Sequence, residues 1–260
     1  MESTVLQESL VDRIKLLVKH PQFYWWIGHV FLVCNSILYF TSVSSFHSDS
    51  VYYYRAYLGA LVSYAIVSYK STGLPKRWHL DIFRNENIQY LALAFYWYSY
   101  QPVTVTLVPY FVFSLFHAFG YIQSTIVPVL FPMDQHPLVA QLCQTIKTYT
   151  DQYHESAMQL TAYTEVVVVI PRLLLGVLLF RTSILALIIF SHFVRLRYYL
   201  SPHTQQAVVK STLMLDHWLL PPTMHPRVPS WLSKVYFNLR GMLVRYGSAT
   251  GSAPPSTTTR

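Results

Sequence analysis

A run of 47 residues, from Asn87 through Met133, contains no Asp, Glu, Lys or Arg. As one continuous helix it would extend about 70 Å, at about 1.5 Å per residue. The hydrocarbon core of a bilayer is only about 30 Å thick. One straight crossing therefore cannot accommodate the run, so it must fold back on itself within or against a membrane, and it predicts a helical hairpin.

The composition agrees with a membrane protein. Hydrophobic residues make up 53% of the 260 positions and charged residues 12%, whereas a soluble domain has about 25% charged residues. The fold class predicted is all-α: a polytopic helical membrane protein with membrane hairpins and cytoplasmic amphipathic helices. Tyrosine clusters at 52–54 and 96–100 are expected at the water–lipid interface, with core filling as the alternative.

The first two apolar blocks predict one hairpin, over about 23–69. Residues 23–43 are uncharged and long enough to cross a membrane. Residues 51–69 are interrupted only by Arg55, which lies near the start of the block, where a long side chain can reach the interface. The membrane domain as a whole is expected over residues 23–200.

The charge-free run predicts the second hairpin, over about 88–131. Its expected turn is Gln101-Pro102, because proline removes a backbone donor and pushes the preceding residue out of helical geometry. Pro109 is the alternative turn, and it would give two more equal arms.

The fourth apolar block, residues 166–194, contains Arg172 and Arg181. It is long for one crossing and short for two, so a shallow hairpin is expected over about 165–195, with a break near Arg181. Before this block, residues 137–162 repeat apolar side chains at three- and four-residue spacing, which predicts an interfacial helix.

Amphipathic segments flank the membrane domain. Residues 1–22 predict an N-terminal amphipathic helix, residues 201–246 a cytoplasmic basic region, and residues 247–260 a disordered tail. Within the basic region, 230–246 predicts an amphipathic helix suited to an anionic or curved leaflet, with packing on the protein itself as the alternative. The residues expected to bind the membrane are Trp231, Leu232, Lys234, Val235, Tyr236, Leu239, Arg240, Met242, Leu243, Arg245 and Tyr246.

The distribution of basic residues predicts an orientation. Of the 19 Lys and Arg, all but Arg55, Arg172 and Arg181 lie in the N-terminal segment, the two connections that flank the charge-free run, or the C-terminal region. Positive residues stay on the cytoplasmic side. These regions and both termini are therefore expected in the cytoplasm, so each hairpin returns to the side from which it entered.

No enzyme motif stands out, and the sequence predicts no catalytic residue, cofactor or metal site. His117 is expected to be a structural histidine, while Glu165 and Arg172 are expected to lie at the interface or to pair with one another. The alternative class is an intramembrane lipid-modifying enzyme or a small transporter. That alternative requires His117, Glu165 and Arg172 to converge on one cavity.

Three short motifs follow one another along the chain in a characteristic order. Residues 99–104 read Ser-Tyr-Gln-Pro-Val-Thr, residues 113–118 read Phe-Ser-Leu-Phe-His-Ala, and residues 195–199 read Arg-Leu-Arg-Tyr-Tyr. Over about residues 20–220 this order resembles the transmembrane protein 33 family, which includes fungal pore-membrane proteins of the nuclear envelope. Gln101 departs from the family pattern, in which Tyr precedes Pro directly. The motif residues are Gln101, Pro102, Pro109, His117, Glu165 and Pro171.

The resemblance implies a non-enzymatic, multi-pass protein of the endoplasmic reticulum membrane and nuclear envelope. Members of the family shape tubular membrane alongside reticulon-type proteins and, in fungi, influence nuclear pore complex organisation. The implied partners are the bilayer, reticulon-type proteins, nucleoporins and an import receptor, with no nucleic acid. The leading hypothesis is a protein that shapes or stabilises curved membrane and supports nuclear pore organisation. A scaffold for soluble partners, with the tail stripe buried against protein, is a further alternative.

Overall fold

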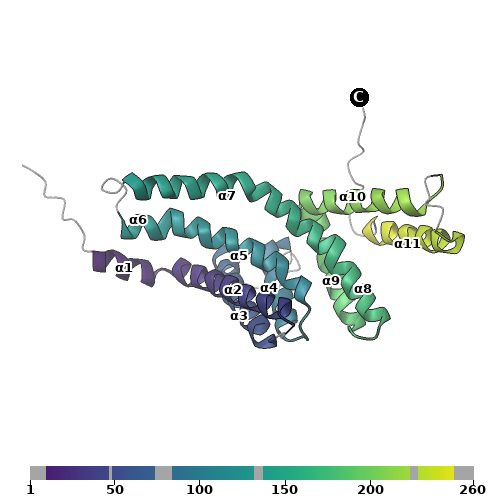
Figure 1. The fold of residues 1–260 in the computed structure, drawn as a ribbon, viewed down its shortest axis with the longest axis horizontal. Coiled ribbons are helices and arrows are strands. Elements are labelled where there is room, and N and C mark those ends of the chain that lie inside the picture. The colour runs from purple at the N-terminus through teal and green to yellow at the C-terminus, as the bar shows by residue number, and fades with distance from the viewer. Residues whose placement is uncertain (1–9, 47–48, 74–83, 132–136, 223–227, 249–260) are drawn as a thin grey trace, which may run out of the picture.

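Every regular element is a helix among the residues that the computed structural model describes, namely 10–46, 49–73, 84–131, 137–222 and 228–248 (Figure 1). The all-α class is thereby confirmed. The tail from residue 249 and the first nine residues of the expected N-terminal helix lie outside the described residues. The helices are α1 (Leu10–Lys19), α2 (Pro21–Ser44), α3 (Ser50–Thr72), α4 (Glu86–Tyr98), α5 (Leu107–Tyr121), α6 (Val127–Leu130), α7 (Pro137–Tyr163), α8 (Ile170–Leu178), α9 (Ile184–Leu200), α10 (Pro202–Leu219) and α11 (Ser230–Ser248).

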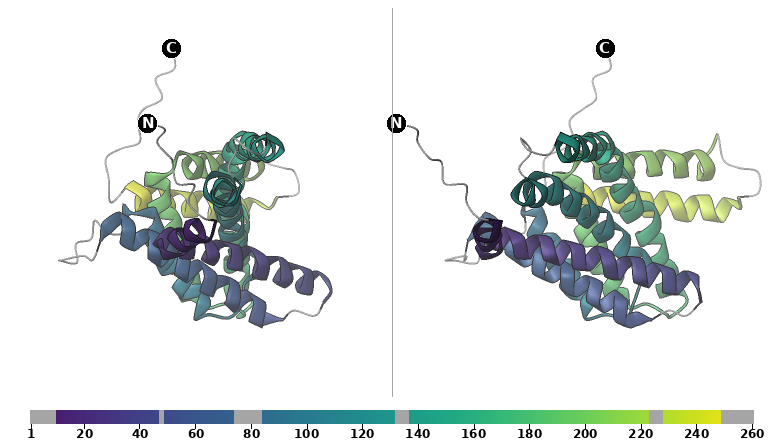
Figure 2. Two further views of the ribbon diagram at one scale, coloured as in Figure 1. Left: turned by 90° about the vertical axis from the view of Figure 1, so that its left-hand side faces the viewer. Right: turned by 60° about the vertical axis from the view of Figure 1, so that its left-hand side comes forward.

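Three helical hairpins form the body of the molecule: α2–α3, α4–α5 and α8–α9. Their turns lie at one end. Tyr39, near the end of α2, is hydrogen-bonded to Thr104 in the second turn (3.1 Å), and the Ser183 N–H in the third turn donates to the Tyr100 hydroxyl in the second (2.6 Å). Figure 2 shows the turns gathered toward the lower edge of the molecule.

The first hairpin is packed closely through two glycines. A Cβ on Gly59 of α3 would lie 2.7 Å from the carbonyl oxygen of Gly28 on α2 and 2.9 Å from the backbone nitrogen of Leu32. The two backbones therefore approach where both residues lack a side chain. Beside this crossing, the Ser63 hydroxyl donates to the carbonyl oxygen of Trp25 (2.9 Å). Neither glycine has another glycine four residues away, so the sequence does not signal the contact.

The segment expected to be an interfacial helix and the first part of the fourth apolar block form one long helical stretch. α7 continues through a π-helical turn, η4 (Thr164–Val169), into α8, where Pro171 is the second residue. Proline cannot donate a backbone hydrogen bond, and a wide turn before it accommodates this loss. The chain then turns at 179–183, the position where the sequence predicts a break, and Phe180 adopts a positive φ of 55°.

Three described stretches are long and apolar enough to cross a membrane: Pro21–Ser44, Thr104–Leu130 and Pro137–Leu178. α9 and α10, which meet at a bend of 113°, make a fourth if the pair is one broken span. The chain is therefore a polytopic membrane protein. α3 is not in this group, although it packs against α2 along the first hairpin.

Candidate functional sites

A tyrosine–threonine cluster joins the first hairpin to the second turn. The side-chain oxygen of Thr106, in the 3-10 turn η2 (Thr104–Thr106), lies 3.1 Å from the Tyr53 hydroxyl and 2.9 Å from the Tyr57 hydroxyl. Its own hydroxyl donates to the carbonyl oxygen of Val103 (2.7 Å). The hydroxyls of Tyr53 and Tyr57 are thus paired inside the protein, which lowers the cost of placing these two side chains away from water.

Tyrosines fill much of the core, which corrects the interface expectation for one of them. Tyr53 is fully buried within the protein, so the core alternative holds at this position. Tyr52 and Tyr54 are partly buried, whereas Tyr98 on α4 is exposed. The other buried tyrosines are Tyr39, Tyr57, Tyr64, Tyr90, Tyr110 and Tyr121.

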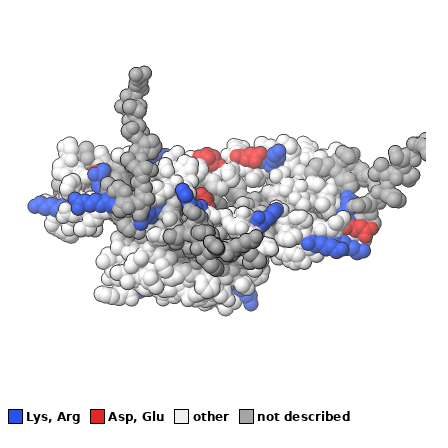
Figure 3. Space-filling model, turned by 180° about the vertical axis from the view of Figure 1, so that it is seen from behind, with Lys and Arg blue, Asp and Glu red and all other residues white. Residues whose placement is uncertain are grey.

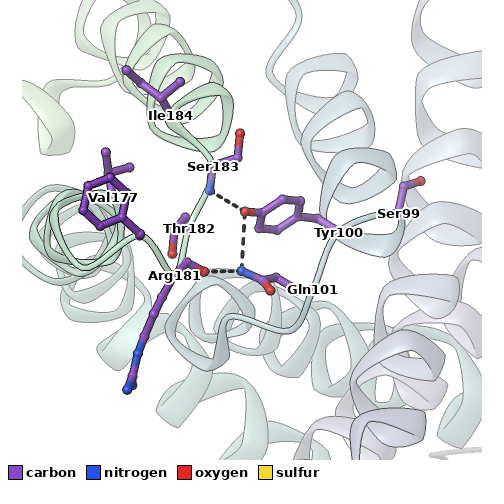
Figure 4. Close-up of a pocket in the computed structure, with 9 residues that line it drawn as sticks. Ser99, Tyr100, Gln101, Val177, Arg181, Thr182, Ser183 and Ile184 are labelled. Carbon is purple, nitrogen blue, oxygen red and sulfur yellow. Dashed lines mark hydrogen bonds between the residues drawn. The ribbon is translucent and has the colours of Figure 1, made fainter.

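The second and third turns bind each other through the motif around Gln101. Its side-chain amide donates to the carbonyl oxygen of Arg181, beside the Tyr100–Ser183 bond (Figure 4). These residues line a shallow, open pocket of about 590 Å³ between the turns. Gln101, the residue that departs from the family pattern, therefore connects two hairpins. Pro102 lies in this turn, while Pro109 lies in the first turn of α5 and is not the turn itself.

An ion-pair cluster lies at the other end of the second and third hairpins. Glu165 in η4 is almost fully buried, and one of its oxygens accepts a hydrogen bond from Tyr90 of α4 (2.7 Å). Its other oxygen lies 3.8 Å from Nε of Arg197 on α9, and Arg197 Nη1 lies 2.6 Å from a carboxylate oxygen of Glu86. The Arg197 guanidinium also stacks over the Tyr90 ring. These contacts connect α4, η4 and α9.

Glu165 does not pair with Arg172, which was one of the two arrangements expected. Arg172 is exposed on α8, and its Nη1 lies beside Gly176 near the third turn. His117 lies on α5, against Trp25 and His29 of α2, with ring centroids 5.2 Å and 4.8 Å apart. The three residues therefore contact three different environments, and no single cavity among the described residues brings them together as the enzyme alternative requires.

The described residues hold no cluster of three or more His, Cys, Asp or Glu that could bind a metal ion. The two cysteines, Cys34 and Cys143, are free. Some buried polar groups instead pair across helices, Tyr53 and Tyr57 with Thr106 and Tyr90 with Glu165, as is common in the core of a helical membrane protein.

The C-terminal helices α10 and α11 form a helical arm held by Asp216. This carboxylate on α10 accepts a hydrogen bond from the Tyr236 hydroxyl (2.8 Å) and pairs with Arg240 (2.9 Å), both on α11. Burial first, and the bond to Asp216 next, raise the pKa of Tyr236 to about 12, so the phenol stays protonated at neutral pH. Because Ser233 is also buried, one face of α11 is directed toward α10.

The opposite side of α11 carries an exposed apolar stripe. Trp231, Val235, Leu239 and Met242 are 64%, 46%, 53% and 66% exposed, and they recur at helical spacing on one face. Leu232 and Tyr236, which the sequence places on the same stripe, are partly buried. The exposed basic residues Lys234 and Arg245 flank the stripe, while the side chains of Leu243 and Tyr246 lie outside those described.

Charge is distributed unevenly over the surface. In Figure 3 the charged side chains gather along the upper part of the face and at its two ends, whereas its lower part, away from the grey atoms, is almost entirely uncharged. α3, α8 and α9 lie in this lower part of the molecule (Figure 1). An uncharged belt beside charged ends is typical of a protein that spans a membrane.

Arg197 and Asp216 are among the residues of these sites that sequence reasoning missed. Arg197 stands in the Arg-Leu-Arg-Tyr-Tyr motif, but its spacing from Glu86 and Glu165 carries no signal of contact. Asp216 could have been found, because it is the only acidic residue after Arg195. A lone acid in a basic segment is a natural partner for one of the surrounding cations.

Together these features define a polytopic helical membrane protein with three interlocked hairpins, a buried tyrosine and ion-pair core, and a basic helical arm. No solved structure matches the chain. The chain belongs to the transmembrane protein 33/nucleoporin POM33 family, which matches residues 6–249.

Three fungal relatives cover most of the chain. The Saccharomyces cerevisiae protein named pore membrane protein of 33 kDa is 26% identical, over 96% of this chain and 92% of the relative. Tetra-spanning protein 1 of Schizosaccharomyces pombe is 29% identical, over 93% and 90%. Nucleoporin POM33 of Chaetomium thermophilum is 30% identical, over 80% of each chain.

Proposed function

We propose that this protein is a non-enzymatic resident of the endoplasmic reticulum membrane and nuclear envelope that shapes or stabilises curved membrane and supports nuclear pore complex organisation. One observation carries the proposal: the three hairpin turns lie together at one end, while the basic arm leaves from the other. The pore membrane proteins and the nucleoporin among its relatives support the location.

The orientation follows from the charges at the two ends. Lys70 at the end of α3 donates to Gln22 at the start of α2 (2.9 Å), and the basic arm begins beyond α9 at the same end. Because positive residues stay on the cytoplasmic side, this end and both termini face the cytoplasm. α3 then crosses with α2, and the paired hydroxyls of Tyr53 and Tyr57 support this placement.

The mechanism is an asymmetric wedge. α1, α7, α10 and α11 add helices at the cytoplasmic end, whereas the described residues at the opposite end belong to the hairpin turns and the adjoining helix ends. A body that occupies more area in one leaflet than in the other favours bending toward the larger side. In this arrangement the protein stabilises membrane that is convex toward the cytoplasm.

The arm adds contact with anionic lipid. The exposed Trp231, Val235, Leu239 and Met242 enter the interface, and Lys234 and Arg245 lie beside the stripe at headgroup level. Each cation near an anionic surface contributes about 1 kcal/mol. Arg240 contributes less in this state, because it is already paired with Asp216.

Liposome flotation of a peptide covering residues 228–248 tests the lipid contact. Trp231→Asp with Leu239→Asp is expected to abolish binding to anionic vesicles. Phe237→Asp is the matched control, because Phe237 is 62% exposed on the same helix but lies off the stripe. Unchanged binding by the double variant, or equal loss in the control, would contradict insertion through this face.

The full-length chain tests the wedge and the location. Reconstitution into large vesicles is expected to produce narrow tubules or small vesicles visible by cryo-electron microscopy, and a fluorescent fusion is expected to concentrate at nuclear pores. Vesicles that keep their diameter at high protein density would refute the wedge. A uniform signal over the endoplasmic reticulum would refute the link to pores.

A further inference from the structure

α7 carries an apolar seam that the described chain covers only in part, at Val139 and Ile146, which are partly buried. Leu142, Tyr149, Tyr153 and Leu160 are each more than half exposed, between 53% and 58%. They lie on one face of a 27-residue helix that starts along the upper edge of the molecule and then descends toward α8 (Figure 1). This face is separate from the side that packs on α5, where Cys143 is buried and the His154 ring contacts Phe116.

The seam follows a heptad repeat over about three heptads. Alternating steps of four and three residues give the first core positions to Val139, Ile146, Tyr153 and Leu160. The second core positions fall on Leu142, Tyr149 and Ser156. Six of these seven side chains are apolar or aromatic. A period of seven with two core positions is the pattern by which one helix packs along another.

The charged residues of α7 indicate that its seam binds another protein rather than an anionic membrane surface. α7 carries Lys147 against Asp151 and Glu155, all away from the seam, whereas α11 carries three basic residues and no acid. The positions that flank the seam on its open side are also neutral: Leu138, Thr145, Gln152 and Gln159. A second helix of the same sequence therefore meets no like charges at this flank.

We propose that this seam pairs with the same seam of a second copy of the chain, in antiparallel orientation about a two-fold axis. Each copy places Ile146 opposite Tyr149, Leu142 opposite Tyr153, and Val139 opposite Ser156. The antiparallel register matches a large side chain with a smaller one in each layer. A parallel pair would instead stack Tyr149 and Tyr153 on their own copies and leave a gap between two Ser156 residues.

Cysteine cross-linking of the full-length chain in lipid nanodiscs or native membranes tests the register. The background is Cys34→Ser and Cys143→Ala, and two differently tagged copies carry Ile146→Cys and Tyr149→Cys respectively. Facing core positions lie within disulfide reach. The disulfide that joins the two tags is expected at a yield at least about tenfold above the control pair.

The control pair is Gln144→Cys with Asp151→Cys. In the proposed dimer these two positions lie at the same height along the helix axes as Ile146 and Tyr149, but on the outer faces of the two helices. They are therefore level with each other without being in contact. Equal cross-linking of both pairs, or of neither, overturns the proposal.

The mass of the assembly gives a second, independent readout. Tyr149→Asp with Tyr153→Asp is expected to convert dimer to monomer in nanodiscs and to raise the dissociation constant at least about tenfold. Burial of even one such side chain lowers a dissociation constant by about that factor. Thr148→Asp, on the polar face, is expected to leave the dimer intact. A wild-type monomer whose seam is accessible to lipid-phase quenchers would assign the seam to the membrane instead and refute the pairing.

Discussion

Substitution of Gly59 by alanine tests whether the close crossing of α2 and α3 holds the first hairpin together. The added Cβ would lie 2.7 Å from the carbonyl oxygen of Gly28. Ordinary contact begins at 3.4 Å, so the helices must separate by about 0.7 Å (3.4 minus 2.7). Both close neighbours of this Cβ are backbone atoms, so no side chain can rotate to relieve the clash.

The cost can be estimated from the same geometry. Overpacking of a tight interface costs about 1–3 kcal/mol. The Ser63–Trp25 hydrogen bond, now 2.9 Å, would lengthen beyond bonding distance, which costs about 0.6 kcal/mol more within a membrane protein. Alanine gains about 1 kcal/mol over glycine in helix propensity. The net expectation is a loss of about 0.6–2.6 kcal/mol, since the steric cost and the lost hydrogen bond together exceed the gain in helix propensity.

Thermal unfolding of the purified protein in detergent, followed by intrinsic fluorescence, measures this loss. Gly120→Ala is the matched control, because Gly120 is also helical but a Cβ there meets nothing within 4 Å. This variant is expected to be slightly more stable than wild type. If Gly59→Ala unfolds at or above the wild-type temperature while Gly120→Ala is stabilised, the close backbone crossing is not a stabilising contact.

The ion pairs of the core and of the arm give two further predictions. Arg197→Met is expected to cost about 3–5 kcal/mol, because it leaves the buried carboxyl group of Glu165 without its cation. Adding Glu165→Gln is expected to recover part of that loss in the same unfolding measurement, and a double variant less stable than Arg197→Met would contradict the pairing. In the arm, Asp216→Asn is expected to release α11 from α10 and speed hydrogen exchange over residues 230–248 severalfold, whereas unchanged exchange would show that Tyr236 and Arg240 do not hold the helix. High salt is expected to reproduce part of this effect in wild type, since the Arg240 side chain is 41% exposed and its pair is screened.

Periodicity and proline are local signals, so a sequence can predict where a helix lies without knowledge of its neighbours. The segment 137–162, predicted to be helical, coincides with α7, and 230–246 lies within α11. The turns near Gln101 and near Arg181 also fall between helices. Whether α7 and α11 lie against lipid stays a prediction, since a helix boundary contains no information about what covers the helix.

The partners of the polar side chains could not be predicted in the same way. Glu165 and Arg172 are seven residues apart and suggest one helix face, but η4 and Pro171 intervene, and the partner of Glu165 is Arg197, which comes from another hairpin. Tyr53 shares its local sequence with Tyr52 and Tyr54, yet it alone of the three is fully buried and lies against Thr106. Such contacts depend on how hairpins rotate about one another.

The charge-free run was enough to predict a membrane protein built of helical hairpins. A charge-free run longer than a bilayer is thick has no other way to satisfy its backbone and its apolar side chains. Which hairpins contact each other became known from the three-dimensional arrangement, because the contacts at Gly28 and Gly59, at Thr106, and between Glu165 and Arg197 join residues far apart in the chain. Packing and pairing at those points depend on distances in space, which sequence spacing does not encode.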